Sequence, residues 1–188
     1  PGSYAFLIDG ITAGWMAVQT LRRKYPDVFL HFHRAMHGAF TENPDHGLSM
    51  MCVADFARMA GSDSLHIGTG IGKMKGGKRE VGEISEEIED AKVVKTKHRL
   101  AQNWGGMKPV FSVCSGGIYP GHVPYLMRNF GNDIIIQAGG GVHGHPGGTA
   151  VGAKALRQAV DGTMEGESLE VYGKSHSELM RAMEFWGK

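Results

Sequence analysis

Val28-Phe29-Leu30-His31-Phe32-His33-Arg34-Ala35-Met36-His37 is the stretch of sequence that decides the fold. Its apolar part, Val28–Phe32, is too short for a comfortable helix and predicts a buried β-strand. Because side chains alternate along a strand, His31 and His33 would share one face while Phe32 packs on the other. Polar side chains therefore stand where this strand ends.

The same pattern recurs along the chain. We predict five strands, at Tyr4–Ile8, Val28–Phe32, Ser64–Ile67, Val110–Val113 and Ile134–Gln137. Helical periodicity is found at Gly14–Tyr25, His46–Gly61, Ile84–Asn103, Val123–Phe130, Thr149–Gly162 and Ser168–Trp186. Alternating strands and helices predict βαβ units and a parallel sheet. No linker or repeat interrupts the pattern, so we expect one structural unit.

Length and composition narrow the class of protein. The 188 residues can bury a core but fall below the usual size of a complete eight-stranded α/β barrel. A net charge of +1 gives no broad field that favours nucleic acid or a membrane surface. Cys52 and Cys114 lack metal-like or disulfide spacing, which favours reduced thiols and a cytoplasmic location. No apolar run approaches a membrane span, and the opening Pro1-Gly2-Ser3 resembles a cloning remnant.

The loops that follow the strands carry the candidate chemistry, because ligands of parallel α/β folds bind beyond the carboxyl ends of the strands. Polar or glycine-rich residues stand at each of these ends, namely Asp9, His33 to His37, His66 to Lys73, Ser115-Gly116-Gly117 and Gly139-Gly140-Gly141. We therefore expect these loops to form a ligand site.

The pair of His31 and His33 admits two interpretations. Two histidines at a strand end can ligate a metal, as in amidohydrolase-type barrels, and His66 could be a further ligand. That arrangement also needs an aspartate after the last strand, where Gly139–Gly141 stand instead. For His31 the alternative is a core histidine whose hydrogen bonds are satisfied.

The glycine-rich stretch Gly68–Gly77 superficially resembles a phosphate loop. It departs from the Walker pattern because three residues, rather than four, separate Gly68 from Gly72, and Met74 follows Lys73. The stretch also departs from the dinucleotide-binding fingerprint, because Gly70 and Gly72 lack a third glycine at the right spacing. What remains is a loop that can close over a ligand and present Lys73 to developing negative charge, or else a surface loop with a solvated lysine.

Two further glycine clusters, Ser115–Gly117 and Gly139–Gly141, follow the last two predicted strands. Glycine lets the backbone approach a ligand closely, and a helix that begins near Gly147–Thr149 would add its amino-terminal dipole. Either cluster alone could be a tight turn. Together they favour a phosphate site.

Four motifs occur in an order and spacing that resemble those of ribulose-bisphosphate carboxylase (RuBisCO) large subunits. They are His31-Phe32-His33-Arg34-Ala35-Met36-His37, His66-Ile67-Gly68-Thr69-Gly70-Ile71-Gly72-Lys73, Ser115-Gly116-Gly117 and Gln137-Ala138-Gly139-Gly140-Gly141-Val142-His143-Gly144-His145-Pro146. The resemblance runs from about Tyr4 to Trp186 and is strongest to archaeal forms.

The resemblance implies an α/β fold, an incomplete TIM-type (β/α) barrel. It would hold about five parallel strands, strands four to eight of the family's barrel, with intervening helices and a C-terminal helix. Residues 1–188 would be the carboxyl-terminal portion of the barrel domain, and the amino-terminal domain and the early strands would be absent.

Two catalytic residues follow from the resemblance. His33 would contact a sugar hydroxyl of the substrate and help to move protons, and His37 would line the same site. Lys73 would contact the carboxylate that forms from carbon dioxide, where charge appears as the reaction proceeds. The resemblance gives Asp9 no catalytic role.

The remaining matched residues would bind the substrate. Arg34 and His66 would bind the phosphate on carbon 5, and Ser115 would hydrogen-bond another hydroxyl. The phosphate on carbon 1 would be held by the backbone of the glycine turns, at Gly116, Gly117, Gly139 and Gly140.

The main difference between this sequence and the family is that it lacks the motif of the family's magnesium site. That site needs a lysine carbamylated by carbon dioxide, with an aspartate and a glutamate two and three residues later, and no Lys-x-Asp-Glu occurs here. Magnesium ligands are therefore expected from the missing segment, and this chain alone should not turn over. The complete enzyme would convert ribulose 1,5-bisphosphate and carbon dioxide into two molecules of 3-phosphoglycerate.

Two alternatives remain open. One is a non-catalytic half-barrel or split-enzyme piece that forms a homo-oligomer or pairs with the complementary amino-terminal half, because an incomplete barrel leaves open sheet edges. The other is a RuBisCO-like enolase or isomerase of sulfur salvage. Those relatives tend to lose substrate-binding residues, whereas His33, Arg34 and Lys73 are present here.

Overall fold

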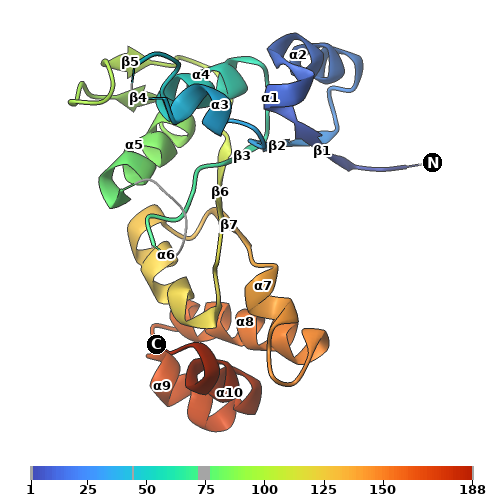
Figure 1. The fold of residues 1–188 in the computed structure, drawn as a ribbon, viewed down its shortest axis with the longest axis vertical. Helices are drawn as coiled ribbons and strands as arrows, with labels where there is room; N and C mark the ends of the chain where they lie inside the picture. Colours follow the sequence, from blue (N-terminus) through green and yellow to red (C-terminus); the bar gives the residue numbers. More distant parts are fainter. Residues whose placement is uncertain (1, 44, 72–76, 188) are drawn as a thin grey trace. The chain divides into compact units, whose positions relative to one another are not determined.

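Five strands form a parallel sheet in this computed structural model, which describes residues 2–43, 45–71 and 77–187. The strand order is β1-β2-β3-β6-β7 (Figure 1). The strands are β1 Ala5–Asp9, β2 Phe29–His33, β3 Ser64–His66, β6 Phe111–Ser115 and β7 Ile134–Gln137. Each lies within two residues of its predicted position, so the predicted sheet is confirmed.

Helices separate and follow the strands, as an α/β fold requires. The longer ones are α2 Trp15–Lys24, α4 Met50–Met59, α5 Lys78–Glu89, α6 Val123–Phe130, α8 Thr149–Met164 and α10 Ser177–Trp186. Short elements are α1 Gly10–Ala13, α3 Gly38–Thr41, α7 Gly140–His143, α9 Leu169–Tyr172 and the 3₁₀ turns η1 Pro120–His122 and η2 Gly173–Ser175. Within the described ranges, no helix combines the length and the apolar character that crossing a membrane requires.

The prediction of one helix over Ile84–Asn103 is wrong. The helix α5 ends at Glu89, and Lys92–Val93 (β4) then pairs antiparallel with Gln102–Asn103 (β5). The β-branched residues that follow Glu89 lose side-chain freedom in a helix, which disfavours its continuation. Arg58 also donates hydrogen bonds of 2.7 and 2.8 Å to two carbonyls at the end of α5, which satisfies groups that another turn would have used.

Two other predicted helices have different boundaries. The segment predicted from His46 becomes helical only at Met50, because the Ser49 hydroxyl accepts the N–H of Cys52 at 3.3 Å and caps α4 there. The predicted helix Ser168–Trp186 is divided into α9, η2 and α10. The division falls at Gly173, a residue type that weakens helices.

Contacts divide the chain into two compact units, whereas the sequence pattern suggested one. The first unit comprises Pro1–Ile67 and Arg79–Val113, and the second comprises Gly68–Lys78 and Cys114–Lys188. In the first unit, the fully buried side chains come from the sheet and from the helices that cover it, including Leu30, Phe32, Leu65, Val53, Ile84 and Ile88.

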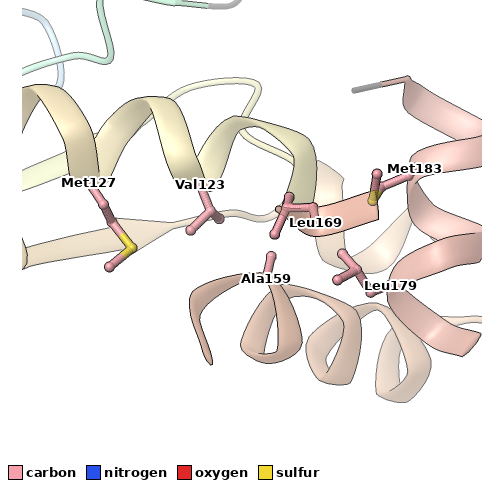
Figure 2. Close-up of a cluster of buried hydrophobic side chains, with 6 residues drawn as sticks. All are labelled: Val123, Met127, Ala159, Leu169, Leu179 and Met183. Carbon is pink, nitrogen blue, oxygen red and sulfur yellow. The ribbon is translucent and has the colours of Figure 1, made fainter. Parts of the chain in front are cut away.

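Helices α6, α8, α9 and α10 build the core of the second unit. Their buried side chains point toward one another (Figure 2), and they are Val123, Met127, Ala159, Leu169, Leu179 and Met183. Helix α8 also packs closely on α7. A Cβ atom at Gly152 would lie 2.0 Å from the carbonyl oxygen of Val142, so this packing requires glycine.

A buried carboxylate ties the first unit together. Asp63 is 3% exposed, accepts the backbone N–H of Leu30 at 2.6 Å and forms ion pairs with Arg22 and Lys108. Arg22 also donates to the carbonyl of Val28 at 2.9 Å. Burial alone would raise the pKa of Asp63, but the hydrogen bonds from Lys108 and Leu30 and the charge of Arg22 hold it below its usual value.

We expect Asp63→Asn to lower the free energy of unfolding at pH 7 by about 3 kcal/mol, because a buried carboxylate loses its ion pairs with Arg22 and Lys108 and half-buried Arg22 loses its counter-charge. A depressed carboxyl pKa stabilises the fold above the unfolded value of about 3.9, and this contribution is lost as the pH falls through the folded pKa. The difference between the two proteins should therefore shrink in acid. Urea unfolding followed by circular dichroism measures both effects.

The matched control is Asp161→Asn, because Asp161 forms an ion pair with Arg157 at the surface on the same helix. Its loss should change the free energy of unfolding by no more than about 0.5 kcal/mol. Equal effects of the two substitutions would show that the buried position of Asp63 has no special importance.

Candidate active site

Three histidines meet where β2 and β3 end. His31 and His33 lie on the same face of β2, as strand alternation predicts, and His66 is the last residue of β3. The Nε2 atoms of His31 and His66 are 2.7 Å apart, which is a hydrogen-bond distance. The ring centres of His33 and His66 are 4.8 Å apart in an edge-on arrangement. The first unit thus brings the three rings into one cluster.

Burial controls the charge of this cluster. His66 is 4% exposed, and burial followed by the nearby His31, His33 and Arg34 lowers its pKa to about 3. Burial and the adjacent His33 also lower the pKa of His31. His66 is therefore neutral near pH 7, with one N–H donor and one acceptor nitrogen.

His31 has a partner on each ring nitrogen. Its Nδ1 lies 2.8 Å from the Ser64 hydroxyl, and its Nε2 faces His66. This arrangement favours the interpretation of His31 as a hydrogen-bonded core histidine. Within residues 2–43, 45–71 and 77–187, no three histidine, cysteine or carboxylate side chains are placed to hold one metal ion.

Asp9 is the residue that the sequence argument left without a role. Register pairs it with His33 across β1 and β2, and its Oδ1 lies 2.6 Å from His33 Nδ1. The sequence did contain a signal for this contact. Asp9 directly follows the first predicted strand, just as His33 directly follows the second. The contact fixes the orientation of the His33 ring.

Arg34 and His37 lie on a tight turn after β2. Met36 between them has φ of 67°, a left-handed conformation that is uncommon for a residue other than glycine. The His37 N–H donates to the Arg34 carbonyl at 3.0 Å, and His37 Nδ1 lies 2.8 Å from the Thr41 hydroxyl. The turn therefore holds both side chains close to the end of β2.

The guanidinium of Arg34 is a buried charge, with the residue 8% exposed. Burial lowers its pKa, and the carboxylate of Glu80 acts in the opposite direction. Burial and the charge of Arg34 also lower the pKa of His37. Arg34 thus supplies positive charge beside neutral His66, a combination suited to an anion.

In the second unit, Ser115 ends β6 and is half-buried. Gly116 and Gly117 follow with φ of 114° and 71°, conformations that side-chain-bearing residues avoid. Gly139 and Gly140 stand at the start of α7, where a Cβ atom would meet nothing within 4 Å. Their backbone is therefore open to approach.

The glycine turns after β6 and β7 lie against each other. A Cβ atom at Gly141 would be 2.0 Å from the carbonyl oxygen of Ile118, so the two turns can pack this closely only with glycine. Gly139–Gly141, which the sequence suggested as a loop, instead leads into the short helix α7. The helix predicted near Gly147–Thr149 is confirmed, because α8 begins at Thr149.

Lys73 lies outside the described residues. The described residues on either side of it are anchored to α6 in the second unit. The hydroxyl of Tyr125 donates to the Gly70 carbonyl at 3.2 Å, and the Lys78 ammonium lies 5.8 Å from the centre of the Tyr125 ring.

Comparison with known proteins identifies a family. Residues 1–186 match the family model of the ribulose bisphosphate carboxylase large chain, catalytic domain. A ribulose bisphosphate carboxylase of Methanosarcina barkeri is 50% identical over 190 residues, covering 99% of this chain and 44% of the relative. One from Methanocaldococcus jannaschii is 46% identical over 187 residues, covering 98% and 44%. The chain therefore spans less than half the length of these relatives.

Solved structures agree with the sequence relatives. The dimeric archaeal Rubisco from Hyperthermus butylicus superimposes with a TM-score of 0.90 at 45% identity, covering 99% of this chain and 44% of that one. The octameric enzyme from Pyrococcus horikoshii gives 0.86 at 44% identity, covering 99% and 42%. The five-stranded sheet matches part of the barrel of these proteins. The chain belongs to the ribulose bisphosphate carboxylase large-chain family.

Proposed function

We propose that this chain is the carboxyl-terminal portion of the catalytic barrel of a ribulose-bisphosphate carboxylase. The whole enzyme would add carbon dioxide to ribulose 1,5-bisphosphate and release two molecules of 3-phosphoglycerate. The observation that carries the proposal is the family match over residues 1–186, which includes the motifs at the carboxyl ends of β2, β3, β6 and β7.

Arg34 and His66 would bind the phosphate on carbon 5. Arg34 contributes a buried positive charge, and the neutral His66 ring contributes an N–H donor. Removal from water strengthens both contacts with an anion. The backbone at Gly116, Gly117, Gly139 and Gly140 would bind the phosphate on carbon 1, and Ser115 would hydrogen-bond another hydroxyl of the substrate.

His33 would transfer a proton at a substrate hydroxyl, with His37 lining the same site. In a neutral ring, the contact with Asp9 would favour the proton on His33 Nδ1, and Nε2 would then be the nitrogen that accepts a proton from the substrate. Asp9 would therefore be a positioning residue. Lys73 would stabilise the carboxylate formed from carbon dioxide.

Magnesium supplies charge stabilisation in this family's chemistry, but the residues of this chain do not fit its site. The sequence has no Lys-x-Asp-Glu, and no group of three metal-binding side chains occurs in the described part of the chain. We propose that the ligands belong to the part of the large chain that the match leaves uncovered. The relatives in solved structures are a dimer and an octamer, which supports a homo-oligomer here as well.

A chimaera tests the proposed function. This chain would replace the aligned segment of the Methanosarcina barkeri relative, and fixation of radiolabelled carbon dioxide would be measured with ribulose bisphosphate and magnesium. We expect fixation by the chimaera and none by the 188-residue chain alone. Turnover by the chain alone, or a folded and assembled chimaera without activity, would contradict the proposal. The second result would favour the non-catalytic alternative.

In the chimaera, Arg34→Ala and Lys73→Ala should fail differently. Arg34 would contact a phosphate present in substrate and transition state alike, so its loss should mainly raise KM. Lys73 would meet charge that develops only as carbon dioxide adds, so its loss should lower kcat by about 10²–10³. Exchange of the carbon 3 proton with solvent should survive in Lys73→Ala. If exchange falls in step with carboxylation, Lys73 acts before carbon dioxide arrives.

The charge of His66 can be measured in the isolated chain. With a folded pKa of about 3, its ring resonances should stay constant between pH 8 and pH 5, whereas in urea they should titrate near 6.5. Between about pH 6.5 and about pH 3, the His66 ring binds a proton in the unfolded chain but not in the folded chain. The free energy of unfolding should therefore fall as the pH drops through this range. A His66→Gln spectrum assigns the signals. A midpoint near 6.5 in the folded chain would show that burial and the neighbouring cations do not lower the pKa of His66.

A further inference from the structure

A cleft lies in the first unit, and none of the residues assigned to the sugar phosphate lines it. It has a volume of about 550 Å³ and is lined by side chains from α4, from α5 and from the segment between residues 95 and 104. Its walls include the apolar side chains of Met51, Met59, Leu100 and Trp104. The volume falls in the range of small-molecule sites.

Two carboxylates from facing helices reach this cleft. Glu87 on α5 is 3% exposed, and its Oε1 accepts the indole N–H of Trp104 at 3.1 Å. Its buried Oε2 has no hydrogen-bond partner among the described residues, and the Nε of Arg99 lies 3.8 Å away, beyond hydrogen-bond distance. The buried Oδ1 of Asp55 on α4 also lacks a hydrogen-bond partner there.

The neighbouring arginines make their hydrogen bonds with other groups, although Arg99 still forms an ion pair with Glu87 and the Nε of Arg58 has no hydrogen-bond partner in the described part of the chain. Arg99 donates to the Glu86 carboxylate at 2.5 Å and to the Glu83 carbonyl at 2.8 Å. Arg58 donates to carbonyls at the end of α5 and stacks over the Trp104 ring, 4.8 Å from its centre. In the part of the chain that the structure describes, one oxygen of Glu87 and one of Asp55 thus lack a hydrogen-bond donor.

Unsatisfied buried acceptors cost free energy, which a donor entering the cleft would recover. Burial and then the charge of Glu87 raise the pKa of Asp55 to about 6, and burial raises the pKa of Glu87. Arg58 opposes both of these shifts and Arg99 opposes that of Glu87, yet one buried oxygen of each carboxylate in this pair still lacks a hydrogen-bond donor in the described part of the chain. A positively charged donor suits it better than a neutral one, because charge-assisted hydrogen bonds are stronger.

We propose that this cleft binds a small organic cation, an ammonium or guanidinium compound with a short apolar chain. Its N–H groups would donate to Asp55 and Glu87, and its chain would pack against Met51, Leu100 and Trp104. The rim carries the exposed Lys95 and Lys97, so the outer end of the ligand would be uncharged or negative. This site is independent of the proposed carboxylase function.

Butylguanidinium is a suitable probe, and butylurea is its uncharged counterpart of nearly the same shape. Each would be titrated into the 188-residue chain while the indole N–H resonance of Trp104, which contacts Glu87, is followed by NMR. We expect saturable binding of butylguanidinium with a Kd on the order of 1 mM. Butylurea should bind at least about tenfold more weakly, since it lacks the charge-assisted bonds.

Substitutions locate the site. Glu87→Gln and Asp55→Asn should each weaken butylguanidinium binding about tenfold, a loss expected for one charge-assisted hydrogen bond. Glu89→Gln is the matched control, because Glu89 lies on the same helix, bonds to Ser85 and does not line the cleft. Its affinity should equal that of the unaltered chain. Circular dichroism checks folding, and Asp55→Asn carries the test if Glu87→Gln does not fold.

Three results would overturn the proposal. Equal affinity for butylguanidinium and butylurea would mean that charge has no part in binding. Unchanged affinity in both Asp55→Asn and Glu87→Gln would place the probe elsewhere. No saturable shift of the Trp104 signal would mean that water alone satisfies the two carboxylates.

Discussion

The carboxylate of Asp63 is the interaction on which the first unit depends. It accepts the N–H of Leu30 in β2, and the next residue, Ser64, begins β3. The same two strands hold His31 and His66, whose rings meet at 2.7 Å. A shift of one residue in the register between β2 and β3 would turn these histidines to the opposite face. The buried ion pairs of Asp63 therefore help to fix the geometry of the histidine cluster.

The polar groups buried in the first unit differ in whether their hydrogen bonds are satisfied. In the histidine cluster, His31 contacts Ser64 and His66, and His33 contacts Asp9, so the rings are held in defined orientations, and burial lowers the pKa of His31 and of His66. The carboxylates of Asp55 and Glu87 keep oxygens without a donor in the described part of the chain. Because desolvation penalises unpaired polar groups, the unpaired oxygens of Asp55 and Glu87 favour a ligand, whereas His31 has a partner on each of its ring nitrogens.

The sheet was predictable because its signal is local. Each strand is a short apolar run that ends in polar residues or glycine. This pattern is typical of the strands of a parallel sheet. The helix over Ile84–Asn103 failed for a non-local reason. Periodic apolar positions continue beyond Glu89, but Arg58 binds the carbonyls at the end of α5 from another helix, and β4 pairs with β5. A linear pattern does not reveal such partners.

The sequence by itself determined the order of the motifs along the chain, their likeness to one enzyme family and the identity of His33, Arg34 and His66 as candidate site residues. Tertiary structure decided which of these groups touch. Asp9 became the partner of His33 through strand pairing, and Glu87 became a buried acceptor through the packing of α5 beside Trp104. The physical reason is that residue types and spacing set the possible chemistry, whereas hydrogen bonds and burial between distant segments exist only once the chain has folded.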